Sequence, residues 1–533
     1  CMESAASLFG CAAPGKSLLP PGDTACFSRD RAGVEPLLYA GLGGGIVSGK
    51  TYEELFAAGV PRKWRCEALV DFLATGTCVF PGGKTFFEGV FEVPPGHDLF
   101  VSEGSASVVE REPLPEASGE LGEETLPLLR DLLEEALGDG LETAALCLSG
   151  GLDSSSLAAA WAKRGTPRCF VYGPPGAPDR ERALEAAKSL GIDPVLLEPD
   201  GPAKLDELKE LFRILEIPVH IPGAPLPQFR LIRAMAGDGV KTVLSGQGGD
   251  ELLCGYPWHF PLAMKKLRSG DPEAAARLEA LHEKNPPFGP IELRMTRRCF
   301  TRTSSWVVLN DGGACAALGL SHEEAAEREG VRFFGADLDD WDALRRHGLT
   351  RRSLRYLLHY DHRLAHHFGV EGRAPMLSAD VVDLVSRFRL DFLYGEGLLK
   401  YPLRLLFPEL PESIRFEARK TGFWHNGPSL PDFRGEVRRM LETTLLGDLV
   451  IRPEKEPHYS QDQGDYAKDD TVPSVLVFPE GSPEPSPVFD LVIKSASFRT
   501  SMSRFLKAVI CAIISSVTPS FTAFDSHFFP IFE

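Results

Sequence analysis

The sequence contains no long hydrophobic run. In its 533 residues no stretch reaches the roughly 18 consecutive apolar residues that a membrane-spanning helix needs. The first residues also lack the charged and apolar pattern of a signal peptide. Because both signals are missing, we expect a cytoplasmic protein that has no membrane partner.

Positive charge is scarce as well. Lysine and arginine number 57 against 75 aspartates and glutamates, which gives a formal net charge of -18. A protein that binds nucleic acid needs a basic surface for the phosphate backbone. We therefore expect small-molecule partners and no nucleic acid, while the composition leaves open whether two copies form a homodimer.

Cysteine motifs are absent too. The 11 cysteines include no C-x-x-C pair and no spacing typical of a metal site, and their odd number excludes complete pairing in disulfides. Reduced thiols in a cytosolic enzyme are the simpler interpretation. The hydrophobic content of 43% and charged content of 25% are those of a globular protein, and the length allows two or three domains.

A turn rich in glycine and serine follows the clearest strand signal of the chain. An apolar run over residues 144–148 leads into this turn, and good helix formers follow it. Backbone N–H groups and the positive end of a helix dipole would converge there, with serine hydroxyls as further donors, so we expect phosphate binding. The residues concerned are Ser149, Gly150, Gly151, Asp153, Ser154 and Ser155.

The turn carries a carboxylate where a nucleoside triphosphatase loop would carry a lysine. Asp153 among phosphate donors makes sense if Mg²⁺ bridges the negative charges. The pattern S-G-G-x-D-S resembles the pyrophosphate loop of the ATP pyrophosphatases, which cleave ATP between the α- and β-phosphates. Some of these enzymes activate a carboxylate as its acyl adenylate. The alternative is an ordinary turn that caps a helix.

Strands and helices alternate after this turn. The pattern predicts an α/β fold with a parallel sheet and helices on both of its faces, and ligands at the carboxyl ends of the strands. An acidic stretch over 110–124 and an amphipathic helix over 126–137 come before it, so a boundary is expected near residue 120. The predicted strands are 169–172, 194–197 and 241–244, and the predicted helices are 179–190, 203–215 and 228–235.

A second glycine-rich loop, residues 245–251, follows the strand at 241–244. It resembles the S-G-x-G-x-D-E loop of the glutamine-hydrolysing asparagine synthetase family, in which the aspartate holds Mg²⁺ and pyrophosphate. This resemblance implies that Asp153 and Asp250 are the metal ligands. It also implies an adenosine site lined by Leu148, Tyr172, Ser245 and Gly246.

The N-terminal region predicts short strands and a Pro-Gly turn, which together form a β-rich layer. The segments at 29–39 and 84–97 resemble the later part of that family's glutaminase domain. The family uses an N-terminal cysteine as glutaminase nucleophile, and Cys1 stands first here. Because Arg29 follows Cys1 too soon for the family's glutamine-binding strands, we expect an ordinary cysteine and a partial domain without glutaminase activity.

The chain beyond residue 257 is predicted to be mostly helical. Its segment at 356–377 holds four histidines but no H-E-x-x-H pattern, so we do not expect zinc. The segment resembles the family's helix that ends in G-V-E-x-R-x-P, and Glu371 then matches a glutamate that positions or deprotonates the attacking amine. By a further resemblance, to R-x-K-x-G-F, Lys420 would stabilise charge in the transition state.

The predicted organisation has three parts. Residues 1–115 form the partial glutaminase-like domain and residues 121–452 the ATP-pyrophosphatase domain with its helical half. Residues 453–533 have no match in the family, and their stretch over 453–487 is rich in proline, glutamate, aspartate and serine, typical of a disordered linker.

The resemblance implies an amide-forming ligase that uses ATP and Mg²⁺ to adenylate a carboxylate, by default that of aspartate, for attack by nitrogen from ammonia or glutamine. Gln247 stands where asparagine synthetases usually carry glutamate, and an amide cannot take a proton from an amine. A β-lactam or macrolactam type of ligase is therefore the second hypothesis. A catalytically inactive regulatory or scaffold protein is the third.

Overall fold

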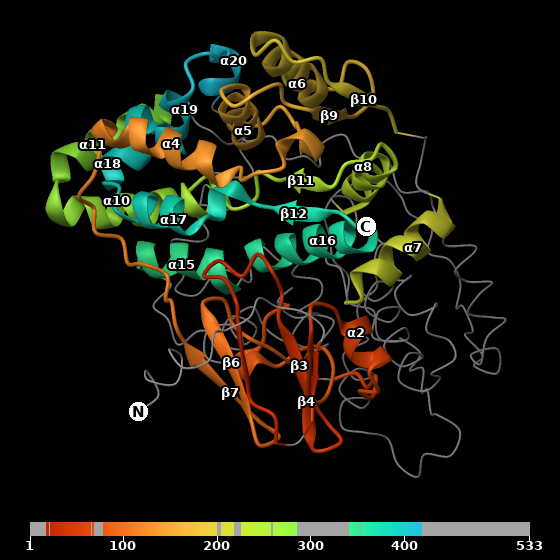
Figure 1. Ribbon diagram of the computed structural model, residues 1–533. Coiled ribbons are helices and arrows are strands. Elements are labelled where there is room, and N and C mark those ends of the chain that lie inside the picture. Colours follow the sequence, from red (N-terminus) through yellow and green to blue (C-terminus); the bar gives the residue numbers. More distant parts are fainter. Residues whose placement is uncertain are drawn as a thin grey trace, which may run out of the picture.

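The computed structural model describes residues 17–417 except 21, 66, 69–77, 200–203, 218–224, 257–258, 285–339 and 352. Two β-sheets form the N-terminal part, and a parallel sheet with its helices forms the rest (Figure 1). The helices α15 and α16 run between these two parts (Figure 1). Cys1, Lys420 and the predicted tail 453–533 lie outside the described residues.

The N-terminal part is β-rich, as expected. Its first sheet has the strand order β1-β4-β3-β5 and its second the order β2-β6-β7, and neighbouring strands are antiparallel in both. Apolar side chains from both sheets meet in one core that includes Phe27, Ile46 and Leu99. The strands are β1 (Ser17–Leu19), β2 (Ala25–Ser28), β3 (Leu38–Leu42), β4 (Gly45–Gly49), β5 (Val90–Glu92), β6 (His97–Ser102) and β7 (Ser105–Glu110), and one helix, α2 (Tyr52–Ala57), follows β4.

The second part contains a five-stranded parallel sheet with the order β10-β9-β8-β11-β12. Residues of β8 alternate between its two faces: Ala144 and Leu146 belong to one apolar core and Ala145 to the other. This period of two places α4, α5 and α6 over one face and α7, α8 and α16 over the opposite face. The predicted α/β class with helices on both faces is confirmed. The strands are β8 (Ala144–Cys147), β9 (Cys169–Tyr172), β10 (Val195–Leu197), β11 (Thr242–Leu244) and β12 (Glu371–Arg373).

Most of the other elements that the structure describes are helices. Those that follow the sequence prediction are α4 (Leu126–Ala136), α5 (Leu152–Ala162), α6 (Pro178–Ser189), α7 (Leu205–Leu215) and α8 (Pro225–Gly237). The helical half comprises α9 (Gly249–Leu252), α10 (His259–Gly270), α11 (Pro272–Lys284), α15 (Trp341–Arg351), α16 (Ser353–His367), α17 (Ala379–Ser386), α18 (Leu390–Leu393), α19 (Tyr401–Leu406) and α20 (Glu412–Arg415). Among the described helices, none is long and apolar enough to cross a membrane.

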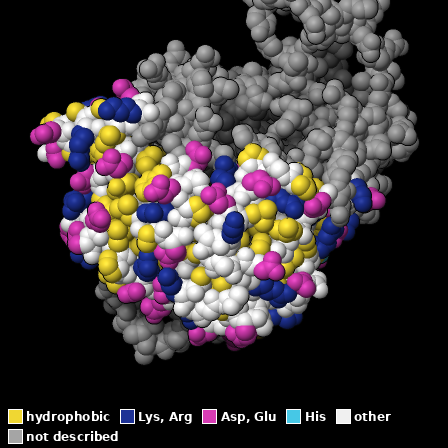
Figure 2. Space-filling view, turned by 90° about the horizontal axis from the view of Figure 1, so that it is seen from above, with side chains coloured by type: hydrophobic (Ala, Val, Ile, Leu, Met, Phe, Trp, Pro, Cys, Tyr) yellow, Lys and Arg dark blue, Asp and Glu magenta, His cyan; other side chains and the backbone are white. Residues whose placement is uncertain are grey.

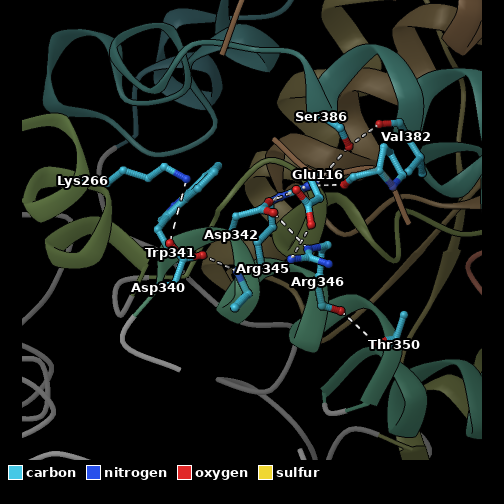
Figure 3. Close-up of polar contacts among 12 residues, drawn as sticks. Glu116, Lys266, Asp340, Trp341, Asp342, Arg345, Arg346, Thr350, Val382 and Ser386 are labelled. Atoms are coloured by element: carbon cyan, nitrogen blue, oxygen red, sulfur yellow. Dashed lines mark hydrogen bonds and ion pairs between the residues drawn. The ribbon is translucent and has the colours of Figure 1, made fainter. Parts of the chain in front are cut away.

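A buried ion cluster ties α15 to the segment that follows the N-terminal sheets. Arg345 is 2% exposed and donates to Asp342 Oδ1 at 2.9 Å, to Ser386 Oγ at 3.2 Å and to the carbonyl of Pro115 at 3.1 Å (Figure 3). Arg346 donates to the other oxygen of Asp342 at 2.9 Å. A buried guanidinium with this many acceptors is satisfied, so the cluster fixes the middle of the acidic stretch against the helical half.

A second buried cluster joins the two parts of the molecule. Glu92 of β5 lies 2.6 Å from Arg29 and 3.2 Å from Arg355 of α16. Arg355 also donates to the carbonyls of Ala32 and Gly33. The loop after β2 is thus held against α16, and its next residues reach the cavity described below.

Among the cysteines that the structure describes, one departs from the expected reduced state. Cys26 of β2 is disulfide-bonded, whereas Cys78, Cys147, Cys169 and Cys254 are free.

On the face seen in Figure 2, basic and acidic side chains are interspersed among apolar ones over the described residues.

Candidate active site

The first loop connects β8 to α5. Gly150 has a φ of 74°, and a Cβ there would lie 2.5 Å from the carbonyl oxygen of Asp179 and 2.7 Å from the amide of Ala183. A side chain at this position would therefore strain the turn and push α6 away. Ser149 and Ser154 are joined through their hydroxyls at 3.0 Å, which holds the turn in shape.

The second loop connects β11 to α9 and packs directly on the first. A Cβ at Gly246 would lie 3.1 Å from the Cβ of Asp153, and one at Gly249 would lie 2.6 Å from Asp153 Oδ1. Because β8 and β11 are parallel neighbours, their carboxyl ends bring both loops to the same edge of the sheet. The two aspartates predicted to bind metal, Asp153 and Asp250, meet there.

A lysine joins these two aspartates. Lys400 Nζ lies 2.5 Å from Asp153 Oδ2 and 2.6 Å from Asp250 Oδ1, and its side chain is 10% exposed. Burial lowers the pKa of the ammonium, but the two carboxylates raise it by more, so the pKa lies above its usual value and the group stays charged. The ammonium of Lys400 thus bridges the carboxylates of the two loops.

Lys400 was not predicted as a site residue. The only signal was its place in the segment 397–404, which is similar to the family's G-x-x-K-x-x-L-R. It precedes α19 with a φ of 54°, a left-handed conformation that non-glycine residues seldom adopt. Strain of this kind at a buried charge is typical of a functional position.

The donor set suits Mg²⁺. Asp153 and Asp250 offer hard carboxylate oxygens, and Mg²⁺ commonly takes one or two carboxylates together with substrate phosphates. Within the described residues no group of three or more metal-ligating side chains occurs. Among the described residues, these two aspartates would hold the ion together with phosphate oxygens and water.

A cavity of about 340 Å³ opens at the two loops, a size within the usual range of small-molecule sites. It continues between the sheet and the helices α8 and α16, and the loop after β2 contributes Val34 and Glu35. Of the predicted site residues, those that line it are Ser149, Gly151, Asp153, Ser154, Ser245, Gly246 and Asp250.

Other predicted residues lie away from this cavity. Leu148 is 2% exposed and belongs to the apolar core, and Ser155 is fully buried. The hydroxyl of Tyr172 accepts from Arg230 of α8 at 3.3 Å. Gly150 packs against α6 and shapes the turn from behind.

Glu371 is also remote from the two aspartates. It begins β12 opposite Thr242, whereas Arg373 lies opposite Leu244, the last residue of β11. Since the loop with Asp250 follows Leu244, Glu371 occupies the other end of the strand pair. Its side chain is 56% exposed and lies 2.8 Å from Arg373. The geometry does not bring Glu371 to this site, because the register of β12 sets its place.

The cavity contains a carboxyl that the sequence analysis missed. Asp361 of α16 accepts hydrogen bonds from Ser245 Oγ at 3.1 Å and from the side-chain amide of Gln228. Burial raises the pKa of Asp361 to about 7, although hydrogen bonds from Gln228, Ser245 and Gln247 oppose this shift. Asp361 stands in the histidine-rich segment 356–377, and no motif around it marks it as a site residue.

The histidines have other contacts. His359 lies 2.7 Å from the carbonyl of Leu215, and burial lowers the pKa of its ring to about 4. Burial also holds the pKa of His362 well below its usual value. Both rings are therefore neutral at pH 7.

Gly255 lets Lys400 reach its partners. A Cβ there would overlap Lys400 Cε and Asp250 Oδ1. We expect Gly255→Ala to lower the free energy of unfolding by about 1–3 kcal/mol, measured by urea denaturation, because the added methyl group overpacks the contact of Lys400 with Asp250. Gly270→Ala, which meets nothing within 4 Å, is the control, and equal stability of the two variants would contradict this placement.

The chain is similar in sequence to several known proteins. A family model described as asparagine synthase matches residues 128–465. The chain is 28% identical over 260 residues to the amidase chyE of Penicillium rubens, covering 43% of this chain and 37% of that protein. For the amidase chry2 of Gibberella zeae the identity is 26% over 313 residues, with 51% and 46% covered. For asparagine synthetase B of Escherichia coli it is 30% over 174 residues, with 29% and 31% covered. The chain thus spans less than half the length of these curated relatives.

Proposed function

Since this chain belongs to the asparagine synthase family, we propose that it is an ATP-dependent amide-forming ligase that releases AMP and pyrophosphate. The observation that carries the proposal is the meeting of Asp153, Asp250 and Lys400 at the carboxyl edge of a parallel sheet. Such an edge is where open α/β sheets bind their ligands. The two loops supply the backbone N–H groups, and the lysine supplies a fixed positive charge.

The phosphates of ATP would lie on the first loop, with the α-phosphate facing the cavity. Asp153 and Asp250 would hold Mg²⁺ beside them. When bound, the ion would offset the negative charge on the phosphates around the bond that breaks. Lys400 would also offset this negative charge, because its ammonium is buried and already positioned by the two carboxylates.

The adenosine would lie toward Ser245 and Gly246, which line the cavity beside the first loop. A substrate carboxylate entering the remaining space would attack the α-phosphorus and form an acyl adenylate, while pyrophosphate leaves. A nitrogen nucleophile would then attack the acyl carbon and displace AMP. Lys420 keeps its predicted role as a second cation for this site.

Aspartate with ammonia is the proposed default pair of substrates. A second candidate is a ligase for another carboxylate and amine, such as one that closes a lactam. Two observations favour keeping it: Gln247 replaces the usual glutamate, and two of the relatives are named amidases rather than asparagine synthetases. An inactive scaffold is the third candidate, and the buried charges at Lys400 argue against it.

The test is pyrophosphate release from ATP and Mg²⁺ with aspartate, plus ammonia or glutamine. Asp250→Asn is the inactive control, and Asp131→Asn, an exposed change on α4, is its matched control. Release with ammonia supports the synthetase, and release with glutamine as well would restore a glutaminase role for Cys1. If ATP with Mg²⁺ raises the melting temperature but no aspartate mixture reacts, the lactam-type ligase is favoured. No effect of ATP on melting would favour the scaffold.

A further inference from the structure

The cavity extends beyond the two loops. This part lies between the sheet face formed by Cys147 and Val243 and the helices α8 and α16, and most of its lining is apolar. Asp361 of α16 stands in this part, about midway along its helix. A carboxyl in apolar surroundings is costly unless something compensates its charge.

The carboxylates that line the cavity differ in their partners. Asp153 and Asp250 share Lys400, and Glu35 pairs with Lys50. The hydrogen bonds to Asp361 come from Ser245, Gln228 and Gln247, all of which are neutral groups. In the part of the chain that the structure describes, no ion pair includes Asp361. The cavity therefore holds a carboxylate whose cation is not supplied by the described residues.

These hydrogen bonds also orient the carboxyl. A carboxylate offers about four acceptor positions. Three donors occupy three of them, so about one position is left for a group that enters the cavity. Gln228 of α8 donates to Oδ1 of Asp361, and Ser245, which follows β11, donates to Oδ2, so two different elements hold the carboxyl. Asp361 is thus fixed by its surroundings before any ligand arrives.

Asp361 is close to the phosphate loops. Its partner Ser245 is followed by Gly246, whose own Cβ position would contact the Cβ of Asp153 at 3.1 Å. One hydrogen bond, one peptide unit and one side-chain contact therefore connect Asp361 to Asp153 at the first loop. A molecule bound to Asp361 and an acyl adenylate bound to the loops would be neighbours in one cavity.

We propose that Asp361 binds the nitrogen substrate, ammonium or a primary alkylammonium ion, and accepts its proton. The proposal rests on the proposed ligase function and names the nitrogen site of the same cavity. Two residues that sequence comparison would favour for this task are unsuited here: Gln247 carries an amide, and Glu371 lies at the far end of β12. Asp361 has both the required chemistry and the required position.

The proton balance of the step is simple. The ammonium gives one proton to the Asp361 carboxylate, and the freed nitrogen lone pair attacks the acyl carbon. The C–N bond forms, the C–O bond to the adenylate breaks, and AMP leaves with the electron pair of that bond. The attacking nitrogen transfers its second proton to the phosphate of the departing AMP, and Asp361 later loses its own proton to water.

The test separates adenylation from nitrogen transfer in Asp361→Asn, with Asp131→Asn as matched control. Adenylation is measured by exchange of labelled pyrophosphate into ATP with aspartate, and transfer is measured with ammonium chloride or with hydroxylamine. Hydroxylamine is much less basic than ammonia and is already unprotonated at neutral pH, so it needs no proton acceptor before it attacks; the proton that its nitrogen loses afterwards leaves to the phosphate of AMP, as with ammonia. We expect exchange and hydroxylamine transfer within about threefold of wild type, and ammonia transfer lowered about 100- to 10,000-fold.

Equal losses with both nucleophiles, or no loss with ammonia, would overturn the assignment. If wild type shows no exchange with aspartate, the proposed substrate fails, and the nitrogen site is then judged by melting temperature alone. Methylammonium chloride should raise the melting temperature of wild type above its value in sodium chloride of equal ionic strength, and Asp361→Asn should lose this difference. No specific rise in wild type, or the same rise in both proteins, would also overturn the assignment.

Discussion

Lys400→Met is expected to reduce pyrophosphate release by at least about 100-fold, because it removes the buried positive charge at the phosphate site. It should also lower the free energy of unfolding by about 3–5 kcal/mol, since Asp153 and Asp250 would then face each other without the lysine's charge. Steady-state assays and urea denaturation in EDTA measure the two effects. Lys188→Met, an exposed change on α6, is the matched control.

Magnesium should partly replace the missing charge. We expect Mg²⁺ to stabilise Lys400→Met more than wild type, because a divalent cation neutralises both carboxylates. The comparison uses melting temperature with and without Mg²⁺, with calcium as a second cation. If Lys400→Met is as stable as Lys188→Met, or gains nothing from either cation, Asp153 and Asp250 do not form the proposed metal site.

Asp361→Asn is expected to stabilise the protein at neutral and alkaline pH. The pKa of this carboxyl is raised from its ordinary value of 3.8 to about 7 by burial. A raised pKa contributes stability that is fully present below pH 3.8 and is lost as the pH rises through about 7. As the pH rises from 3.8 to about 7, the free energy of unfolding of wild type should therefore fall by up to about 4 kcal/mol relative to that of Asp361→Asn.

The neighbouring groups do not produce the same profile. Tyr360 on the same helix and Cys147 on β8 have pKa values that burial raises far above neutrality, so both stay uncharged. His362, the next residue, has its pKa lowered well below its usual value. Urea denaturation from pH 4 to 8 measures the difference, with Asp131→Asn as control. Parallel profiles for wild type and Asp361→Asn would show that Asp361 titrates normally.

Much of the architecture is predictable from local pattern. The apolar run at 144–148 and the segments at 169–172 and 241–244 become β8, β9 and β11, and their flanking helices appear within a few residues of the expected bounds. Periodicity distinguishes the two kinds of element here, because a strand buried on both faces is a short continuous apolar run, whereas a helix with one apolar stripe has apolar residues three or four positions apart. The parallel order then brings the two glycine loops to one edge, so the neighbouring positions of Asp153 and Asp250 follow from sequence.

The placement of Glu371 does not follow from local pattern. The motif around it predicts a role at the reacting amine, but strand pairing places Glu371 opposite Thr242 and away from the second loop. Register is set by packing of the whole sheet rather than by the residues of one strand. A motif therefore identifies a segment, while the partner strand decides which of its side chains reach the site.

The sequence by itself determined the α/β class, the two phosphate-side loops and their carboxylates, because these depend on residues close together in the chain. Only the tertiary structure decided that Lys400, 247 residues from Asp153, joins the two loops, and that Asp361 of α16 meets Ser245, 116 residues away. Contacts at such separation arise from how helices pack on the sheet, and no local pattern records that packing. The charge that holds the carboxylates together and the carboxyl proposed for nitrogen therefore emerge from the folded chain alone.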